Sequence, residues 1–148
     1  KSKQTRSLNP GNYGKLDADN QAVLNLRSGK YAFKEFKVGH GVTINLDLSG
    51  GPITIDVVGD VDMGQGAKMV IKAGGGAENI LWRVQGEHIN LKQDGKFLGT
   101  FLAPNAAIDL DERATLTGAL YGLEVEIRQR AVVTGRPAVS LLISLALA

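Results

Sequence analysis

The chain has no cysteine among its 148 residues, which excludes disulfide bonds and thiolate metal sites. It also has no run of like charge, because 17 basic and 15 acidic residues are scattered along it and leave a net charge of +2. The absence of a basic stripe argues against nucleic acid as a partner. No stretch reaches the roughly 18 apolar residues that a membrane span requires. The length fits one domain.

What the sequence does contain is a short apolar–polar–apolar pattern that returns six times. Its successive starts differ by 20, 25, 20, 19 and 17 residues, which is typical of the turns of a parallel β-solenoid. Because side chains alternate sides in a strand, the outer members of each triplet are predicted to point inward and stack as a core ladder. The ladder comprises Leu24, Leu26, Ile44, Leu46, Met69, Ile71, Ile89, Leu91, Ile108, Leu110, Val125 and Ile127.

Longer internal matches favour the same architecture. Gly99 and Gly118 lie 19 residues apart, and this offset predicts that Phe97 stacks on Leu116 and Phe101 on Leu120. Glycines in almost every gap mark the predicted corners. The predicted fold is all-β, a single-stranded parallel β-helix with rungs of about 17–25 residues and no helical interruption.

Three segments follow from these patterns. Residues 1–7 are polar and basic and are predicted to form a flexible N-terminal arm. Residues 8–137 carry the β-solenoid, and residues 138–148 form an apolar C-terminal strand of period two. Its apolar face consists of Val139, Leu141, Ile143, Leu145 and Leu147. Two interpretations remain open: this strand caps its own last turn, or it inserts against another copy and mediates head-to-tail self-association.

Three carboxylates are candidates for catalysis. Enzymes built on parallel β-helices cluster carboxylates on neighbouring turns, so Asp56, Asp60 and Asp62 are candidates for acid and base. Asp60 and Asp62 flank Val61 and are predicted to share an outer face, which is equally the pattern of a solvated strand. No nearby arginine or histidine completes a site, so no catalytic residue is predicted.

Metal and cofactor sites are not predicted either. His40 and His88 have no second histidine at a ligand spacing. Asp109, Asp111 and Glu112 could offer oxygens to calcium, but Arg113 follows at once and the oxygen-rich nonapeptide repeat is absent. Glycine runs lack the residues of a phosphate loop. We therefore expect no metal, no cofactor and no enzymatic activity.

Flat β-helix faces can also bind ice, which would call for ranks of threonine. Only Thr115 and Thr117 make such a pair within a strand. The outward triplet positions are instead predicted to form one polar file of Asn25, Asn45, Val70, Asn90, Asp109 and Glu126. Such a file suits solvent, lateral contacts or sugars, so ice binding is disfavoured and binding of a surface glycan or matrix protein remains open.

Several stretches carry a resemblance to a known family. These are residues 9–14, 24–33, 49–55, 80–82 and 99–106, of which the Leu102–Ala106 stretch after Gly99-Thr100 is the most specific. Together they resemble the repetitive β-helix domains of bacterial surface proteins, in particular the choice-of-anchor A type and related pilus-associated domains, over residues 8–135. The resemblance implies a non-catalytic β-helix outside the cell or on its surface, after removal of an export signal. The architecture, without a shared motif, is also similar to that of bactofilins.

These observations together predict a structural protein. The favoured function is that of a non-catalytic subunit of an extracellular or cell-surface filament, whose partner is a second copy of itself joined through the solenoid ends and the C-terminal strand. The alternative is a surface module for adhesion or glycan binding. A polysaccharide-cleaving β-helix enzyme is the remote alternative.

Overall fold

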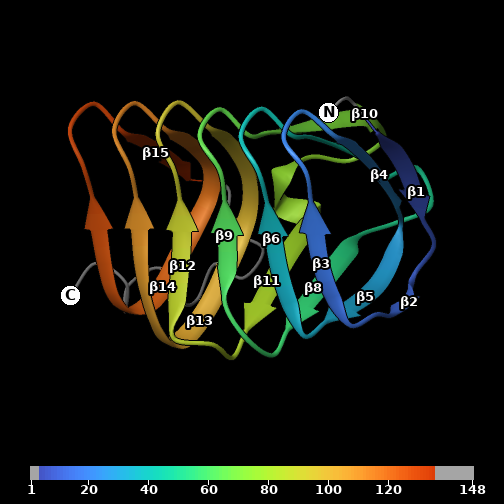
Figure 1. The fold of residues 1–148 in the computed structure, drawn as a ribbon, viewed down its shortest axis with the longest axis horizontal. Helices are drawn as coiled ribbons and strands as arrows, with labels where there is room; N and C mark the ends of the chain where they lie inside the picture. The colour runs from blue at the N-terminus through green and yellow to red at the C-terminus, as the bar shows by residue number, and fades with distance from the viewer. Residues whose placement is uncertain (1–3, 136–148) are drawn as a thin grey trace.

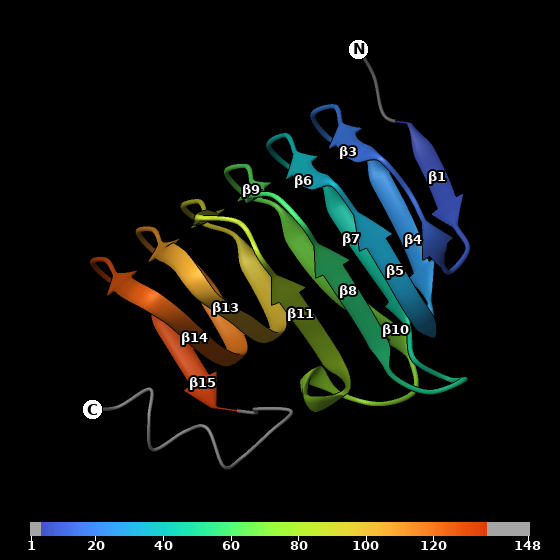
Figure 2. The same ribbon diagram turned by 90° about the horizontal axis from the view of Figure 1, so that it is seen from below.

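The computed structural model describes residues 4–135, which wind as a parallel β-solenoid with three faces (Figure 1). The turns stack from β1 at one end of the molecule to β15 at the other (Figure 2). All strand pairs are parallel and join each turn to the next. The predicted all-β parallel solenoid is thereby confirmed.

Each face is a ladder of equivalent strands. Face A contains β1 (Thr5–Leu8), β4 (Val23–Arg27), β7 (Thr43–Asp47), β10 (Lys68–Ala73), the first parts of β13 (Lys96–Leu110) and β14 (Thr115–Ile127), and β15 (Val132–Gly135). Face B contains β2 (Gly11–Asn12), β5 (Gly29–Phe33), β8 (Ile53–Val57), β11 (Ile80–Val84) and the middle of β13 and β14. Face C contains β3 (Lys15–Ala18), β6 (Glu35–Val38), β9 (Val61–Met63), β12 (His88–Leu91) and the ends of β13 and β14.

Turn length varies more than the sequence pattern predicts. A short turn leads from Thr115 to its partner Val132, whereas a much longer one leads from Lys68 to its partner Lys96. The long turn exceeds the predicted range because a loop with the 3₁₀ turn η1 (Ala77–Asn79) is inserted between β10 and β11. Apart from this three-residue 3₁₀ turn, no helix interrupts the coil in residues 4–135. Figure 2 shows the 3₁₀ turn projecting at the corner of the coil.

The six triplets lie on two faces. The triplets that begin at Leu24, Ile44 and Met69 lie in β4, β7 and β10 of face A. Those that begin at Ile89, Ile108 and Val125 lie on face C. The series therefore changes face between Met69 and Ile89. That step is not one turn of the coil, because the partner of Ile89 on the preceding turn is Val61.

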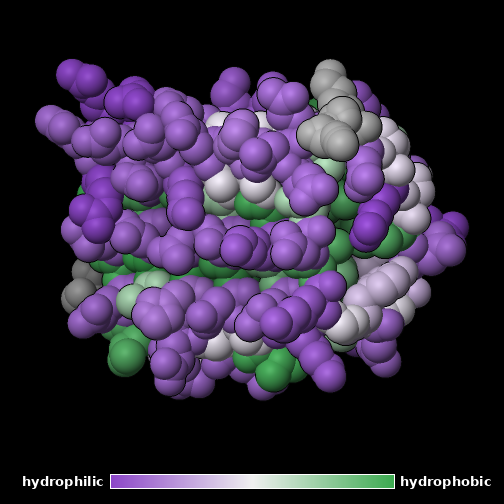
Figure 3. Space-filling view, in the orientation of Figure 1, coloured by the Kyte–Doolittle hydropathy of each residue, from purple (hydrophilic) through white to green (hydrophobic). Residues whose placement is uncertain are grey.

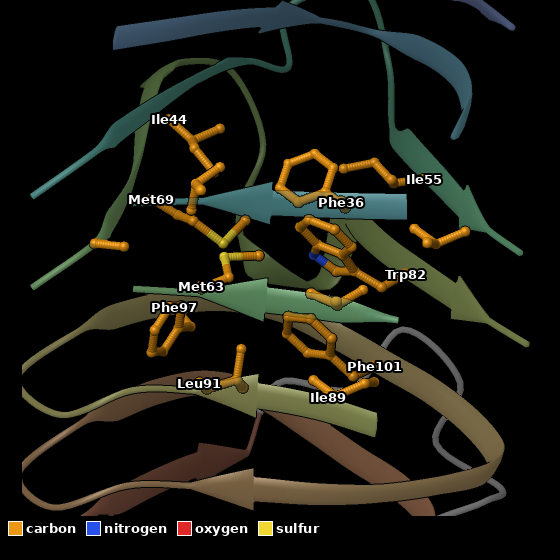
Figure 4. Close-up of a cluster of buried hydrophobic side chains, with 14 of the residues drawn as sticks. Phe36, Ile44, Ile55, Met63, Met69, Trp82, Ile89, Leu91, Phe97 and Phe101 are labelled. Carbon is orange, nitrogen blue, oxygen red and sulfur yellow. The ribbon is translucent and has the colours of Figure 1, made fainter. Parts of the chain in front are cut away.

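Aromatic side chains form the centre of the core (Figure 4). The Trp82 ring lies parallel to Phe101 with centroids 5.0 Å apart, and it meets Phe36 edge to face at 5.1 Å. All three residues are at most 1% exposed. Because they come from faces B and C, their contacts join the two faces and bridge successive turns.

Part of the predicted arm is a strand. Residues 5–8 form β1, which pairs with β4 in register from Thr5–Val23 to Leu8–Leu26. The physical reason is that the outer edge of β4 carries backbone N–H and C=O groups that require partners. The solenoid therefore begins before residue 8.

Glycines stack at one corner of the coil, where Gly99, Gly118 and Gly135 are in register. Gly118 has a φ of +148°, and a Cβ there would overlap the carbonyl oxygen of Gly99. We expect Gly118→Ala to destabilise the protein by more than about 1 kcal/mol in chemical denaturation, since alanine disfavours positive φ. Gly135→Ala is the matched control, because nothing lies within 4 Å of the position that its Cβ would occupy. Equal losses for the two variants would contradict this account.

Candidate functional site

Face C is charged along its whole length, and Figure 3 shows hydrophilic side chains in rows across it. Pairs of opposite charge join successive turns, as between Lys92 and Asp62 at 3.4 Å. Arg128 donates hydrogen bonds of 2.8 and 3.0 Å to both carboxylate oxygens of Asp109, which raises the pKa of the guanidinium. Such pairs are exposed and contribute little to stability individually. Their charged groups remain hydrated.

The three candidate carboxylates are each engaged by a neighbouring turn. Asp56 lies on face B, where Arg83 donates hydrogen bonds of 2.6 and 2.9 Å to it. Asp60 accepts the backbone N–H groups of Glu87 and His88 at 2.9 and 3.1 Å. Asp62 points outward on face C toward Lys92. The structure therefore does not bring these carboxylates together in one site that could supply an acid and a base.

The acidic cluster near the last turns is paired with arginine. Arg128 forms an ion pair with Asp109 and lies 3.9 Å from Asp111. Arg113 lies 3.7 Å from Glu112. Arg113 also donates to Asp94 at 2.8 Å and thereby lowers the pKa of that carboxyl group. Within residues 4–135, no three histidine, cysteine or acidic side chains converge in a way that could hold a metal ion.

Face B is uneven. Its outward positions include Lys30, Asp56 and Arg83, which carry charge, while Thr100 and Tyr121 are at most 9% exposed. The inserted loop contributes to this cover, since η1 packs against β13 and β14. Face B therefore offers no regular outward array.

Face A carries two regular outward columns, in which register stacks equivalent residues of successive turns. The first column is Thr5, Val23, Thr43, Lys68, Lys96, Thr115 and Val132. The second column follows two residues along each strand; it is Ser7, Asn25, Asn45 and Val70 up to β10, and Leu98, Thr117 and Thr134 from β13 onward. Of these two columns only the first is charged, at its two lysines. A further outward position at the ends of β4 and β7 carries the charged residues Arg27 and Asp47.

The first three turns of face A form the largest uncharged part, which we call the uncharged array. It consists of Thr5, Ser7, Val23, Asn25, Thr43 and Asn45. Strand geometry spaces these residues about 4.8 Å apart between turns and about 6.7 Å apart along a strand. The Asn45 amide donates to Asn25 Oδ1 at 2.9 Å, and the Asn25 amide donates to Ser7 Oγ at 3.2 Å. This hydrogen-bonded ladder fixes the orientation of the amides.

A seam interrupts face A between β10 and β13. The two strands pair only at Lys68–Lys96, and the Leu98 N–H donates to the Met69 sulfur at 3.4 Å instead of to a carbonyl. The inserted loop stands beside this seam and lines a shallow groove with Leu98 and Thr117. Beyond it, Thr115, Thr117, Val132 and Thr134 form a second uncharged patch.

Sequence reasoning missed the array because its members come from different strands. The predicted outward file combined Asn25, Asn45 and Val70 of face A with Asn90, Asp109 and Glu126 of face C. Register separates them into an uncharged column and a charged one. The missed signal was the recurrence of uncharged residues at Thr5, Val23 and Thr43, each two positions before a member of the second column.

The structure thus defines a three-faced β-solenoid with one regular, sparsely charged face. Residues 3–133 match the family model described as Ice-binding-like. The chain belongs to this family. This corrects the resemblance to choice-of-anchor A and pilus-associated domains.

A solved structure shows the same fold. It is described as an ice binding protein from an Antarctic bacterium of the Flavobacteriaceae, with a TM-score of 0.62 and 14% sequence identity. The alignment covers 91% of this chain and 43% of that one, so this chain spans less than half the length of its structural neighbour. No curated protein matches the sequence.

The family assignment also corrects the predicted function and partners. The filament subunit, the glycan or matrix adhesin and the polysaccharide-cleaving enzyme are wrong, as is the prediction of a second copy as partner. The proposed self-association residues Val139, Leu141, Ile143, Leu145 and Leu147 lie outside the described residues. No helix in residues 4–135 is long and apolar enough to cross a membrane.

Proposed function

We propose that the protein binds ice through face A, with the uncharged array as the primary contact. Membership of the Ice-binding-like family and the name of the structural neighbour support the activity. The observation that supports the location is the register of the two columns, which presents hydroxyl, amide and methyl groups without charge over three successive turns.

The geometry of an ice crystal explains why face A is suited to binding it. An ice surface is a fixed lattice of water molecules, so a partner must be flat, repetitive and rigid to contact many of them at once. Strand spacing supplies the repeat, and the Asn45–Asn25–Ser7 hydrogen bonds restrict the side chains before binding, which reduces the entropy lost on contact. Methyl groups of threonine and valine favour removal of disordered water.

Charge explains why the other faces are less suitable. Lysine ammonium groups are strongly hydrated and carboxylates resist desolvation. Face C bears a charged outward residue on nearly every strand, and face B bears Lys30, Asp56 and Arg83. On face A, Lys68 and Lys96 separate the uncharged array from the second patch.

The function fits a non-catalytic protein that acts outside the cell, where ice grows. The candidate carboxylates are held in ion pairs or backbone hydrogen bonds. No step of ice binding requires a cofactor, since the contacts are hydrogen bonds and van der Waals contacts with water.

Partitioning into ice tests the proposal. The full chain, unlabelled and quantified by the absorbance of its single tryptophan, is included in a solution from which an ice hemisphere is grown slowly. We expect the protein to be enriched in the ice and single crystals in its presence to grow with facets. Exclusion from the ice as complete as that of an inert protein of similar size, together with unfaceted discs, would contradict ice binding.

A further inference from the structure

The second uncharged patch on face A is richer in threonine than the uncharged array. It consists of three threonines and one valine, and register stacks Thr115 on Val132 and Thr117 on Thr134. Thr115 and Thr134 are exposed, and the Val132 side chain is 52% exposed. The patch therefore presents hydroxyl and methyl groups to solvent, which are two of the groups that the array presents.

The strands of the two patches end differently on face A. Past the second column, β4 and β7 of the array continue to a further outward position that holds the charged residues Arg27 and Asp47. In β14, Thr117 is followed directly by Gly118 and Ala119, where the chain turns onto face B. No charged side chain stands at this edge of β14, so the second patch is less bordered by charge than the array is.

A pair of lysines stands between the two patches. Lys68 and Lys96 are exposed, and they form the single register pair between β10 and β13. On face C, by contrast, Lys92 is matched with the Asp62 carboxylate of the neighbouring turn. Like charges directly opposite each other destabilise a sheet, so stability does not account for the lysine pair.

We propose that the second uncharged patch is a second ice-binding site, and that Lys68 and Lys96 prevent the two sites from acting as one surface. The inference rests on the proposed function, because it divides the ice contact of face A into two parts. Register places three strand spacings, each of about 4.8 Å, between Thr43 and Thr115. Both lysines lie in that interval, and their ammonium groups are strongly hydrated and costly to desolvate.

The separation lowers the affinity that face A could reach. Two sites on one rigid body bind a common surface much more tightly than either site alone, but the gain is lost when they cannot make contact simultaneously. Threonine at both lysine positions would make the first column uncharged from Thr5 to Val132. Threonine is also favoured in strands, so the exchange is compatible with the fold.

Replacing both lysines tests the barrier. We expect Lys68→Thr/Lys96→Thr to bind ice at least about tenfold more tightly than the unmodified protein, since linked sites can gain that much or more. The measurement is partitioning into a growing ice hemisphere over a range of protein concentrations, with unfolding midpoints in urea to show that each variant is folded. Lys30→Thr/Lys37→Thr is the matched control, because it removes the same charge from faces B and C, and its affinity should be unchanged.

A tyrosine at Thr115 tests the second site itself. Added to Lys68→Thr/Lys96→Thr, Thr115→Tyr should remove the gain and return the affinity to that of the unmodified protein, because the uncharged array stays intact. Absence of a gain in the double variant, an equal gain in the control, or a gain that survives Thr115→Tyr would each overturn the second site while leaving ice binding in place. Exclusion of the unmodified protein from ice would be a different result, since it would overturn the proposed function and the second site with it.

Discussion

Replacing Thr43 by tyrosine should abolish most of the partitioning into ice. Thr43 lies in the first column of face A, between Val23 and Lys68 on the neighbouring turns. A phenol ring there would stand above the plane of the array and separate its neighbours from the crystal. A loss of about 1.4 kcal/mol of contact free energy corresponds to a tenfold loss of affinity, so we expect the affinity for ice to fall by at least about that factor.

Thr54→Tyr is the matched control for this change. Thr54 is also an outward threonine of the same turn, but it lies in β8 on face B. Both variants add the same ring to a strand, where tyrosine is well tolerated, so their unfolding midpoints should be alike. Thr54→Tyr should bind ice as the unmodified protein does. If it lost binding and Thr43→Tyr did not, the ice-binding surface would lie on face B instead of face A.

The fold was predictable because its signals are local and repeat. Alternation of apolar and polar residues identified the strands, and the recurrence of Gly99 at Gly118 correctly stacked Phe97 on Leu116. The assignment of triplets to turns was less accurate. Strands of face A and face C share the same apolar–polar–apolar pattern. Because the loop before β11 lengthens one turn, the face C triplet at Ile89 falls 20 residues after the face A triplet at Met69 and resembles its equivalent on the next turn.

The candidate site was not predictable from the same signals. Its order comes from register between strands, and the sequence separation between neighbours in the first column changes with the length of every corner. A search for paired threonines within one strand found Thr115 and Thr117 but not Thr5 and Thr43, which lie two turns apart. Ice binding was disfavoured for that reason, whereas the match to the Ice-binding-like family supports the proposal that the protein binds ice.

The core that keeps the faces in place should depend strongly on Trp82. Its indole is fully buried between Phe101 and Phe36 (Figure 4). Trp82→Ala would remove both ring contacts and leave a cavity, for which the expected loss is about 3–5 kcal/mol in the free energy of unfolding. Because solenoid turns are stable only when stacked on one another, we expect ice partitioning and the folded signal to be lost together as the denaturant concentration rises.

Trp82→Phe separates the packing of the indole from its polar atom. Among the described residues, Trp82 Nε1 has no hydrogen-bond partner although it is buried, and an unsatisfied buried donor costs about 1–3 kcal/mol. Phenylalanine removes that donor and keeps an aromatic ring between Phe36 and Phe101, so its loss of stability should be well below that of alanine in urea titration. Equal losses for the two variants would show that the volume of the indole outweighs its unpaired N–H. Since neither change touches the uncharged array, each folded variant should bind ice with unaltered affinity.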